Sequence, residues 1–349
     1  MEFTKEETNI AKGAAITLML VHHLFYFSDR ILNGNSYIPL IPFLNLEVRI
    51  GFFGNICVST FLFLSGYGML LGFLRSKEPT LSYSLKKLKN FYLTYWLYFL
   101  VFVPIGLFLF PKETIWHSTQ IRYSAEPMHL IQGLLGWNYS YNSEWWFIRP
   151  FILILLFFFP LYAKLIDKNI SVILFISISI ALLCRRFQDN VDNIDSVIGE
   201  TAFLQISFAL GMVCAKWKFF SSQLIENFDK LGWIWVAAWL GLCYLLKALG
   251  FFYDFLIVPF FVYFSIRAIA ILRLSKLFAF LGKYSFGMWL VHSFFCYYYF
   301  QDFIYAPKWA PLIFSLLTVV SLLSVLGIES LRAYCSALWM SSKRLRQAD

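Results

Sequence analysis

The sequence has 349 residues, of which 60% are hydrophobic, 21% aromatic and only 14% charged. Soluble domains average about 45 to 50% apolar and about 25% charged residues, so the composition excludes a soluble protein and indicates an integral membrane protein. The formal net charge of +9 fits the excess of basic residues in the cytoplasmic segments of membrane proteins. It therefore does not indicate nucleic-acid binding.

Apolar runs long enough to cross about 30 Å of hydrocarbon recur along the whole chain. They are continuous rather than alternating, which predicts helices and not a barrel. We therefore expect an all-α polytopic membrane protein with about ten transmembrane helices, at residues 9–28, 51–74, 91–110, 146–166, 170–185, 197–215, 231–249, 252–272, 279–300 and 310–333.

The basic residues predict the orientation of these spans. If both termini face the cytoplasm, most lysines and arginines fall in segments on that side, including the run 75–89 and the C-terminal segment 332–346. We therefore expect cytoplasmic N- and C-termini. The longest polar segment, at about 111–144, then lies on the outer face.

The first span, "NIAKGAAITLMLVHHLFYF", carries one lysine and two adjacent histidines. Eleven helical positions separate Lys12 from His23, which places them within about 20° of each other and roughly 16 Å apart along the axis. His22 points about 80° away from that line. Lys12 could extend to the cytoplasmic interface while His23 makes an interhelical hydrogen bond. Alternatively, Lys12 binds an anionic cofactor and His23 transfers a proton.

The segment after the second span contains five basic residues on the same side as Lys12. Lys86 and Lys89 stand three positions apart and share one face of a helix. These charges could simply set the topology, or they could bind phosphates together with Lys12. The six cysteines are scattered singly without metal-ligand spacing, so we expect neither a disulfide nor a metal site.

Several of these motifs resemble those of the acyltransferase-3 family of bacterial membrane proteins. Lys12 and His23 match the family's basic residue, ten intervening positions and histidine. The stretch 58–69, with Ser65 and Gly66, is similar to the family's Phe-rich Ser-Gly motif, although many relatives have an acidic residue where Ser59 stands. Ser65 and Gly66 could equally serve close helix packing.

Three further segments extend the resemblance over essentially the whole chain. Lys86 and Lys89 resemble an Arg-x-x-Arg pair. Residues 143–160 resemble the start of a later span, where Arg149 falls near the position of a glutamate in other subgroups. Residues 281–295 resemble a family segment that ends in Leu-x-His, and His292 is the histidine at this position. It could be a second polar group near the substrate, or it could pack between helices.

The resemblance implies a function and a donor. It implies an O-acyltransferase, by default an O-acetyltransferase, that moves an acyl group from cytoplasmic acyl-CoA to a surface, capsular or lipid-linked polysaccharide. His23 would be the catalytic base or an acyl relay, and Lys12, Lys86 and Lys89 would bind acyl-CoA. His22, Ser65, Gly66 and His292 are candidates for supporting roles, Ser65 and Gly66 as oxyanion donors. We expect acetyl-CoA as the donor and no metal.

The resemblance also predicts the setting of the enzyme. We expect one membrane domain over residues 1–349 in the bacterial cytoplasmic membrane, in contact with lipid and carbohydrate, without the C-terminal hydrolase-like domain of some relatives. Polysaccharide-assembly proteins are candidate partners. The outer segment has aromatic and polar residues that either stack on sugars or form an interfacial belt: Trp116, His117, Arg122, Tyr123, His129, Trp137, Tyr139 and Tyr141.

Two other classes of protein compete with this hypothesis. A polysaccharide or lipid-glycan transporter would need no acyl-transfer chemistry, although the sequence shows no clear inverted repeat of the kind such proteins often have. A structural membrane scaffold would tolerate alanine at both Lys12 and His23 without loss of any activity.

Overall fold

The computed structural model describes residues 3–116, 118–188, 196–230, 232–250 and 253–345. These residues form an almost wholly helical structure in which two isolated β-bridges take the place of a sheet. In chain order the α-helices are α1 (Lys5–Val21), α2 (Leu46–Gly54), α3 (Ile56–Arg75), α4 (Thr80–Leu109), α5 (Pro127–Leu134), α6 (Ile148–Leu153), α7 (Phe159–Leu165), α8 (Ile170–Gln188), α9 (Ser196–Lys216), α10 (Gln223–Asp229), α11 (Trp233–Lys247), α12 (Asp254–Ile271), α13 (Ser275–Ser293), α14 (Gln301–Tyr305) and α15 (Ala310–Leu345).

Short turns of tighter or wider helix connect or interrupt these elements. Among the described residues, three are π-helical: η1 (His22–Tyr26), η5 (Ile154–Phe158) and η8 (Phe294–Tyr298). The 3₁₀ turns of three or more described residues are η2 (Ser28–Arg30), η3 (Pro42–Leu44), η4 (Ser143–Phe147) and η6 (Phe219–Ser221). Single π turns inside helices often occur at functional sites, and two of the three, η1 and η8, contribute side chains to the candidate site described below.

Each of the ten predicted spans overlaps helical residues, and six helical stretches of the described residues are long and apolar enough to cross a membrane. These are Leu46–Arg75, Thr80–Leu109, Ser143–Leu165, Val197–Lys216, Asp254–Ile271 and Ala310–Ala337. Two shorter apolar helices, Ile170–Cys184 and Trp233–Lys247, lie at other predicted spans. A membrane protein of several spans is therefore supported, while the number ten and the side of the termini stay predictions.

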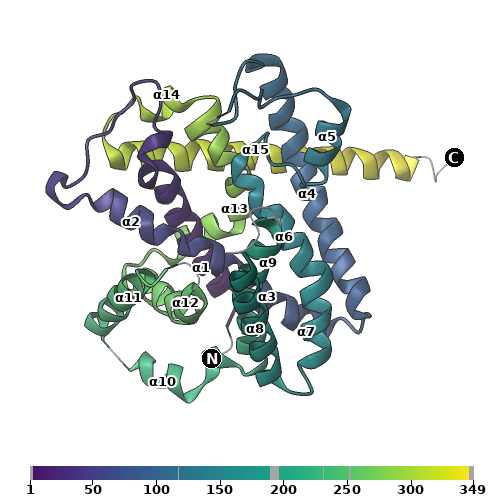
Figure 1. Ribbon diagram of the computed structural model, residues 1–349, viewed down its shortest axis with the longest axis vertical. Helices are drawn as coiled ribbons and strands as arrows, with labels where there is room; N and C mark the ends of the chain where they lie inside the picture. Colours follow the sequence, from purple (N-terminus) through teal and green to yellow (C-terminus); the bar gives the residue numbers. More distant parts are fainter. Residues whose placement is uncertain (1–2, 117, 189–195, 231, 251–252, 346–349) are drawn as a thin grey trace.

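Close packing of helix backbones builds the centre of the bundle. α1 lies along α13, and α3 lies along α9 (Figure 1). A Cβ atom at Gly282 of α13 would run into the Asn9 carbonyl and the Gly13 nitrogen of α1, so this contact needs a residue without a side chain. Gly66 of α3 meets the Phe208 carbonyl of α9 in the same way. Small residues thus set the separation of both helix pairs.

The core of the described residues has two large apolar clusters that meet along α3 and α4, and a small third one of Ile10, Ala14 and Ile269. One cluster joins α3 to α7, α8, α9, α11 and α12, and the other joins α1 to α4, α13 and α15. Val58 and Leu88 pack against both clusters.

The long helix α15 runs across the upper part of the view and projects beyond its neighbours at its C-terminal end, whereas the N-terminus lies in the lower part (Figure 1). The candidate site lies between the two clusters.

Candidate functional site

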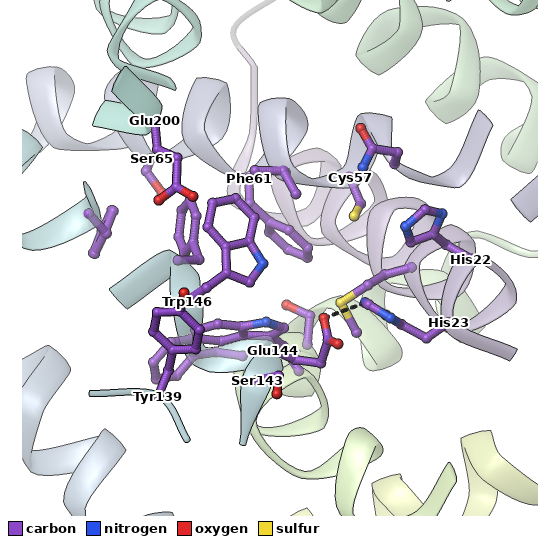
Figure 2. Close-up of a pocket in the computed structure, with 18 of the residues that line it drawn as sticks. His22, His23, Cys57, Phe61, Ser65, Tyr139, Ser143, Glu144, Trp146 and Glu200 are labelled. Carbon is purple, nitrogen blue, oxygen red and sulfur yellow. Dashed lines mark ion pairs between the residues drawn. The ribbon is translucent and has the colours of Figure 1, made fainter. Parts of the chain in front are cut away.

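A cavity of about 690 Å³ reaches from Lys12 of α1 to Arg30, at the end of the η2 turn beyond it. α1, α3, α4, α9, α13 and the η4 turn all contribute to its wall. The wall is largely aromatic, but it also carries charged and polar side chains (Figure 2). Lys12, His22 and His23, which the sequence placed on one span, all line this cavity. A single extended ligand could therefore contact both Lys12 and His23.

Tyr297 fixes the orientation of the His23 ring. Both residues lie in π turns, His23 in η1 and Tyr297 in η8. The Tyr297 hydroxyl donates to the His23 carbonyl at 2.5 Å, and its oxygen lies 3.3 Å from His23 Nδ1. Because the single hydroxyl hydrogen is used on the carbonyl, Nδ1 must be the donor in the second contact. The neutral His23 ring therefore carries its free lone pair on Nε2.

Glu144 faces that nitrogen. Its Oε2 lies 3.4 Å from His23 Nε2, as the dashed line in Figure 2 shows. Its backbone nitrogen donates to the side chain of Asn142, which caps η4 and also accepts a hydrogen bond from Ser293. Glu144 is only 5% exposed. A proton that arrives on Nε2 would thus form an imidazolium directly beside a buried carboxylate.

When the His23 ring is neutral, the positive charge of Arg30 compensates the Glu144 carboxylate. Its Nη1 lies 2.9 Å from Glu144 Oε1, and its guanidinium stacks over Phe27 and Trp116 at 3.9 and 4.5 Å from the ring centroids. Burial alone would lower the pKa of Arg30, but the Glu144 carboxylate more than offsets this, so the pKa of Arg30 lies above its usual value. The guanidinium therefore keeps its charge and holds Glu144 in place.

The other two histidines of the site have fixed contacts. His22 Nδ1 lies 2.7 Å from the Gly51 carbonyl, and its ring stacks on Tyr26. His292 is fully buried, its Nδ1 lies 2.8 Å from the carbonyl of Trp289, and its ring centroid is 4.8 Å from that of His23. A carbonyl accepts only, so both Nδ1 atoms donate. His22 reaches the cavity despite the predicted 80° offset, while His292 packs behind His23.

The remaining predicted residues divide between the cavity and other places. Ser65 lines the cavity, whereas Gly66 makes the close contact with α9. Lys86 and Lys89 are exposed on the first turns of α4, outside the cavity wall, and Lys86 pairs with Glu78 at 2.7 Å. The helix that carries them begins at Thr80, eleven residues before the predicted span. The structure therefore places Lys12, His23 and Ser65 along one cavity and leaves the lysine pair outside it. In Figure 2, Ser65 lies beside Glu200 and away from His23 in the view.

The segment that precedes η4 contributes two aromatic residues to the cavity, Trp116 and Tyr139. Tyr123 and Tyr141 are buried in the core instead, and Trp137 is 50% exposed. Buried Arg122 donates to the Ser140 carbonyl at 2.9 Å and stacks over Tyr298. His129 lies 2.5 Å from Ser140 Oγ. His117 lies outside the described residues.

Sequence reasoning missed the functional placement of Glu144, Arg30 and Tyr297. The signal for Glu144 was an ionisable residue at the start of an apolar run, which is costly in a membrane unless it has a task. Arg30, shortly after the predicted first span, offered a matching charge. In the described part of the chain, no group of three or more His, Cys, Asp or Glu side chains could hold a metal ion.

Comparison with known proteins adds a family to this geometry. A family model described as an acyltransferase domain, that of the acyltransferase-3 family, matches residues 6–329, essentially the whole chain. The matched range includes every residue of the cavity wall. Searches of curated proteins and of solved structures gave no match.

Proposed function

The chain belongs to the acyltransferase-3 family and is a membrane acyltransferase, and we propose that it transfers an acyl group, by default acetyl, from cytoplasmic acyl-CoA to a polysaccharide hydroxyl. The acceptor is a surface, capsular or lipid-linked polysaccharide. The observation that carries the proposal is the cavity that is lined by both Lys12 and the His23–Glu144–Arg30 cluster. Such a cavity offers an anion-binding end and a basic centre to the same ligand.

The donor lies with its phosphates at the Lys12 end. A lysine is a point charge that binds phosphate without bidentate geometry, and Lys86 and Lys89 attract the nucleotide part from the exposed start of α4. The extended pantetheine arm bridges the roughly 16 Å between Lys12 and His23. The apolar and aromatic wall excludes water from the thioester on the way. The acyl carbon thus arrives beside Nε2 of His23.

The reaction is a direct transfer with His23 as general base. The acceptor hydroxyl oxygen attacks the thioester carbonyl while Nε2 takes its proton. A C–O bond forms and the C–S bond breaks as the tetrahedral intermediate collapses. The CoA thiolate leaves and receives the proton from the imidazolium, so the enzyme returns to its starting state. The Glu144 carboxylate stabilises the imidazolium, and the Tyr297 hydroxyl accepts from Nδ1 and so keeps that nitrogen protonated. In other enzymes, too, a carboxylate stabilises the catalytic imidazolium and fixes the tautomer of the histidine.

The negative charge on the carbonyl oxygen needs hydrogen-bond donors in the cavity. The Ser65 hydroxyl lines the wall and is the candidate among the residues that the family motif suggests. Gly66, the other candidate, uses its position for the close contact with Phe208. His22 and His292 support the site by shaping the wall and by packing against His23.

An acyl-histidine relay is the variant of this mechanism. In the relay, Nε2 itself attacks the thioester, CoA leaves first, and the acceptor then takes the acyl group. Rapid quench with radiolabelled acetyl-CoA and no acceptor distinguishes the two. Label bound to the wild-type protein but not to His23→Ala supports the relay, and its absence leaves direct transfer.

The enzyme acts in the bacterial cytoplasmic membrane, where lipid surrounds its apolar helices and assembly proteins deliver the polysaccharide. The test compares wild type with His23→Ala in a host that lacks the protein, at equal membrane levels. Mass spectrometry then measures ester-linked acyl groups on the surface polysaccharide. We expect these esters only with wild type, on polysaccharide of unchanged amount and length. Unchanged acylation in the variant, or a fall in polysaccharide export without any acylation, would favour the transporter instead.

A further inference from the structure

A second carboxylate lines the same cavity, and the proposed reaction does not use it. Glu200 lies near the start of α9 and contributes to the cavity wall. Its Oε2 is buried and has no hydrogen-bond partner among the described residues. An ionisable group inside a membrane span is costly and is rarely kept without a partner or a task. A buried acceptor atom without a donor adds to that cost.

The nearest basic residue does not satisfy this carboxylate. Arg149 of α6 attracts Glu200 electrostatically, but no ion pair joins these two described side chains. Its guanidinium instead lies over the ring of Tyr139, 4.6 Å from the centroid, and its Nε is likewise buried without a hydrogen-bond partner among the described residues. Arg149 therefore offsets the charge of Glu200, but the carboxylate oxygen Oε2 can still accept a hydrogen bond from a ligand in the cavity.

Aromatic side chains stand beside it. Tyr139 and Trp146 both line the cavity, and in Figure 2 the indole of Trp146 lies between Glu200 and Glu144 in the view. A carboxylate offers acceptor sites for neighbouring hydroxyl groups, and the face of an indole offers a flat apolar surface for ring carbons. Together they suit a ligand with several hydroxyl donors on one edge and C–H groups on its face.

The charges of the cavity select a neutral ligand over a cation. The described cavity lining carries two basic residues, Lys12 and Arg30, and two carboxylates, Glu144 and Glu200. Arg149 lies outside the lining and adds a further positive charge that acts on Glu200. A ligand ammonium group would be repelled there, whereas a polyhydroxyl ring would supply the missing hydrogen-bond donors at no charge cost.

We propose that Glu200 and Trp146 form the acceptor subsite, which binds one sugar ring through its non-reacting hydroxyls while another hydroxyl of the acceptor reaches His23. The inference rests on the proposed function for the identity of this ligand as an acceptor. The subsite also gives specificity, because a sugar that lacks the hydroxyl bound by Glu200 leaves a buried carboxylate unpaired. Sites built to bind a hydroxyl reject the deoxy analogue strongly, by up to about 10⁴- to 10⁵-fold.

The test measures binding without chemistry. The full chain in nanodiscs is titrated with oligosaccharides from the host's surface polysaccharide, freed of esters by mild base, and saturation-transfer NMR gives the affinity. Acetyl-CoA affinity is measured separately. The variants are Glu200→Gln and Trp146→Leu. Their matched controls are Glu126→Gln and Trp235→Leu, at two exposed residues outside the cavity.

We expect both cavity variants to weaken oligosaccharide binding at least tenfold and to change acetyl-CoA affinity less than twofold, with both controls like wild type. The subsite is refuted if oligosaccharide affinity is unchanged in Glu200→Gln, or if acetyl-CoA affinity falls instead. The two proposals fail separately. Glu200-dependent binding without acyl transfer by wild type would keep the subsite and remove the transferase, whereas acyl transfer with normal binding by Glu200→Gln would do the reverse.

Discussion

The substitution Glu144→Gln removes one negative charge and preserves the size of the side chain. The Oε2 of Glu144 lies 3.4 Å from His23 Nε2. At an effective dielectric constant of about 20, a full positive charge on the ring gains about 5 kcal/mol from this carboxylate. Each 1.36 kcal/mol is a tenfold change in rate. We therefore expect kcat to fall about 100-fold if half a charge has developed in the transition state, and several thousand-fold if the whole charge has. Arg30, no longer neutralised, acts in the same direction.

The assay follows CoA release and ester formation by the protein in nanodiscs, with acetyl-CoA and ester-free oligosaccharide at saturating concentrations. Glu126→Gln is the matched control because its carboxylate is exposed outside the cavity. Thermal unfolding checks that the variant is folded. In a protein that already carries His23→Ala, Glu144→Gln should lower kcat little further, since the two residues serve the same step. A single variant that keeps more than a third of the wild-type kcat would refute the role assigned to Glu144.

Three further predictions concern the supports of the site. Arg30→Met should destabilise the protein by about 3 to 5 kcal/mol, because it leaves the Glu144 carboxylate buried and unpaired. The double variant with Glu144→Gln should regain most of this stability in thermal unfolding. A double variant as unstable as Arg30→Met would contradict the pairing. Tyr297→Phe should lower kcat roughly tenfold or more without changing the KM for acetyl-CoA, because Nδ1 loses its acceptor; an unchanged kcat would contradict the assigned tautomer. Gly282→Leu should lower the unfolding temperature by separating α1 from α13, whereas Gly327→Leu, which has open space around it, should not; equal melting of both variants would contradict the packing argument.

The helices could be predicted from the sequence because continuous apolar runs determine them locally. The described part of each predicted span overlaps helical residues. Their ends were less accurate, since α4 already begins at Thr80 and the run 146–166 is divided into η4, α6, η5 and α7. These interruptions depend on contacts with other helices. Local hydrophobicity contains no information about them.

The sequence predicted only some of the residues of the candidate site. The eleven-residue spacing of Lys12 and His23 predicted that both face one side of a helix, and both line one cavity. The contacts of His23 with Glu144 and Tyr297 join residues far apart in the chain. They arise from the packing of the η1, η4 and η8 turns, which no spacing rule describes. The resemblance instead placed Arg149 near the position of a glutamate in other subgroups of the family.

In the proposed reaction the acyl group passes from a donor on one side of the membrane to an acceptor on the other. The most direct measurement seals ester-free oligosaccharide inside proteoliposomes and adds radiolabelled acetyl-CoA outside. We expect label on the enclosed oligosaccharide of intact vesicles with wild type, and none with His23→Ala. Label that appears only after the vesicles are opened would contradict transfer across the membrane, and equal label with the variant would contradict the role of His23.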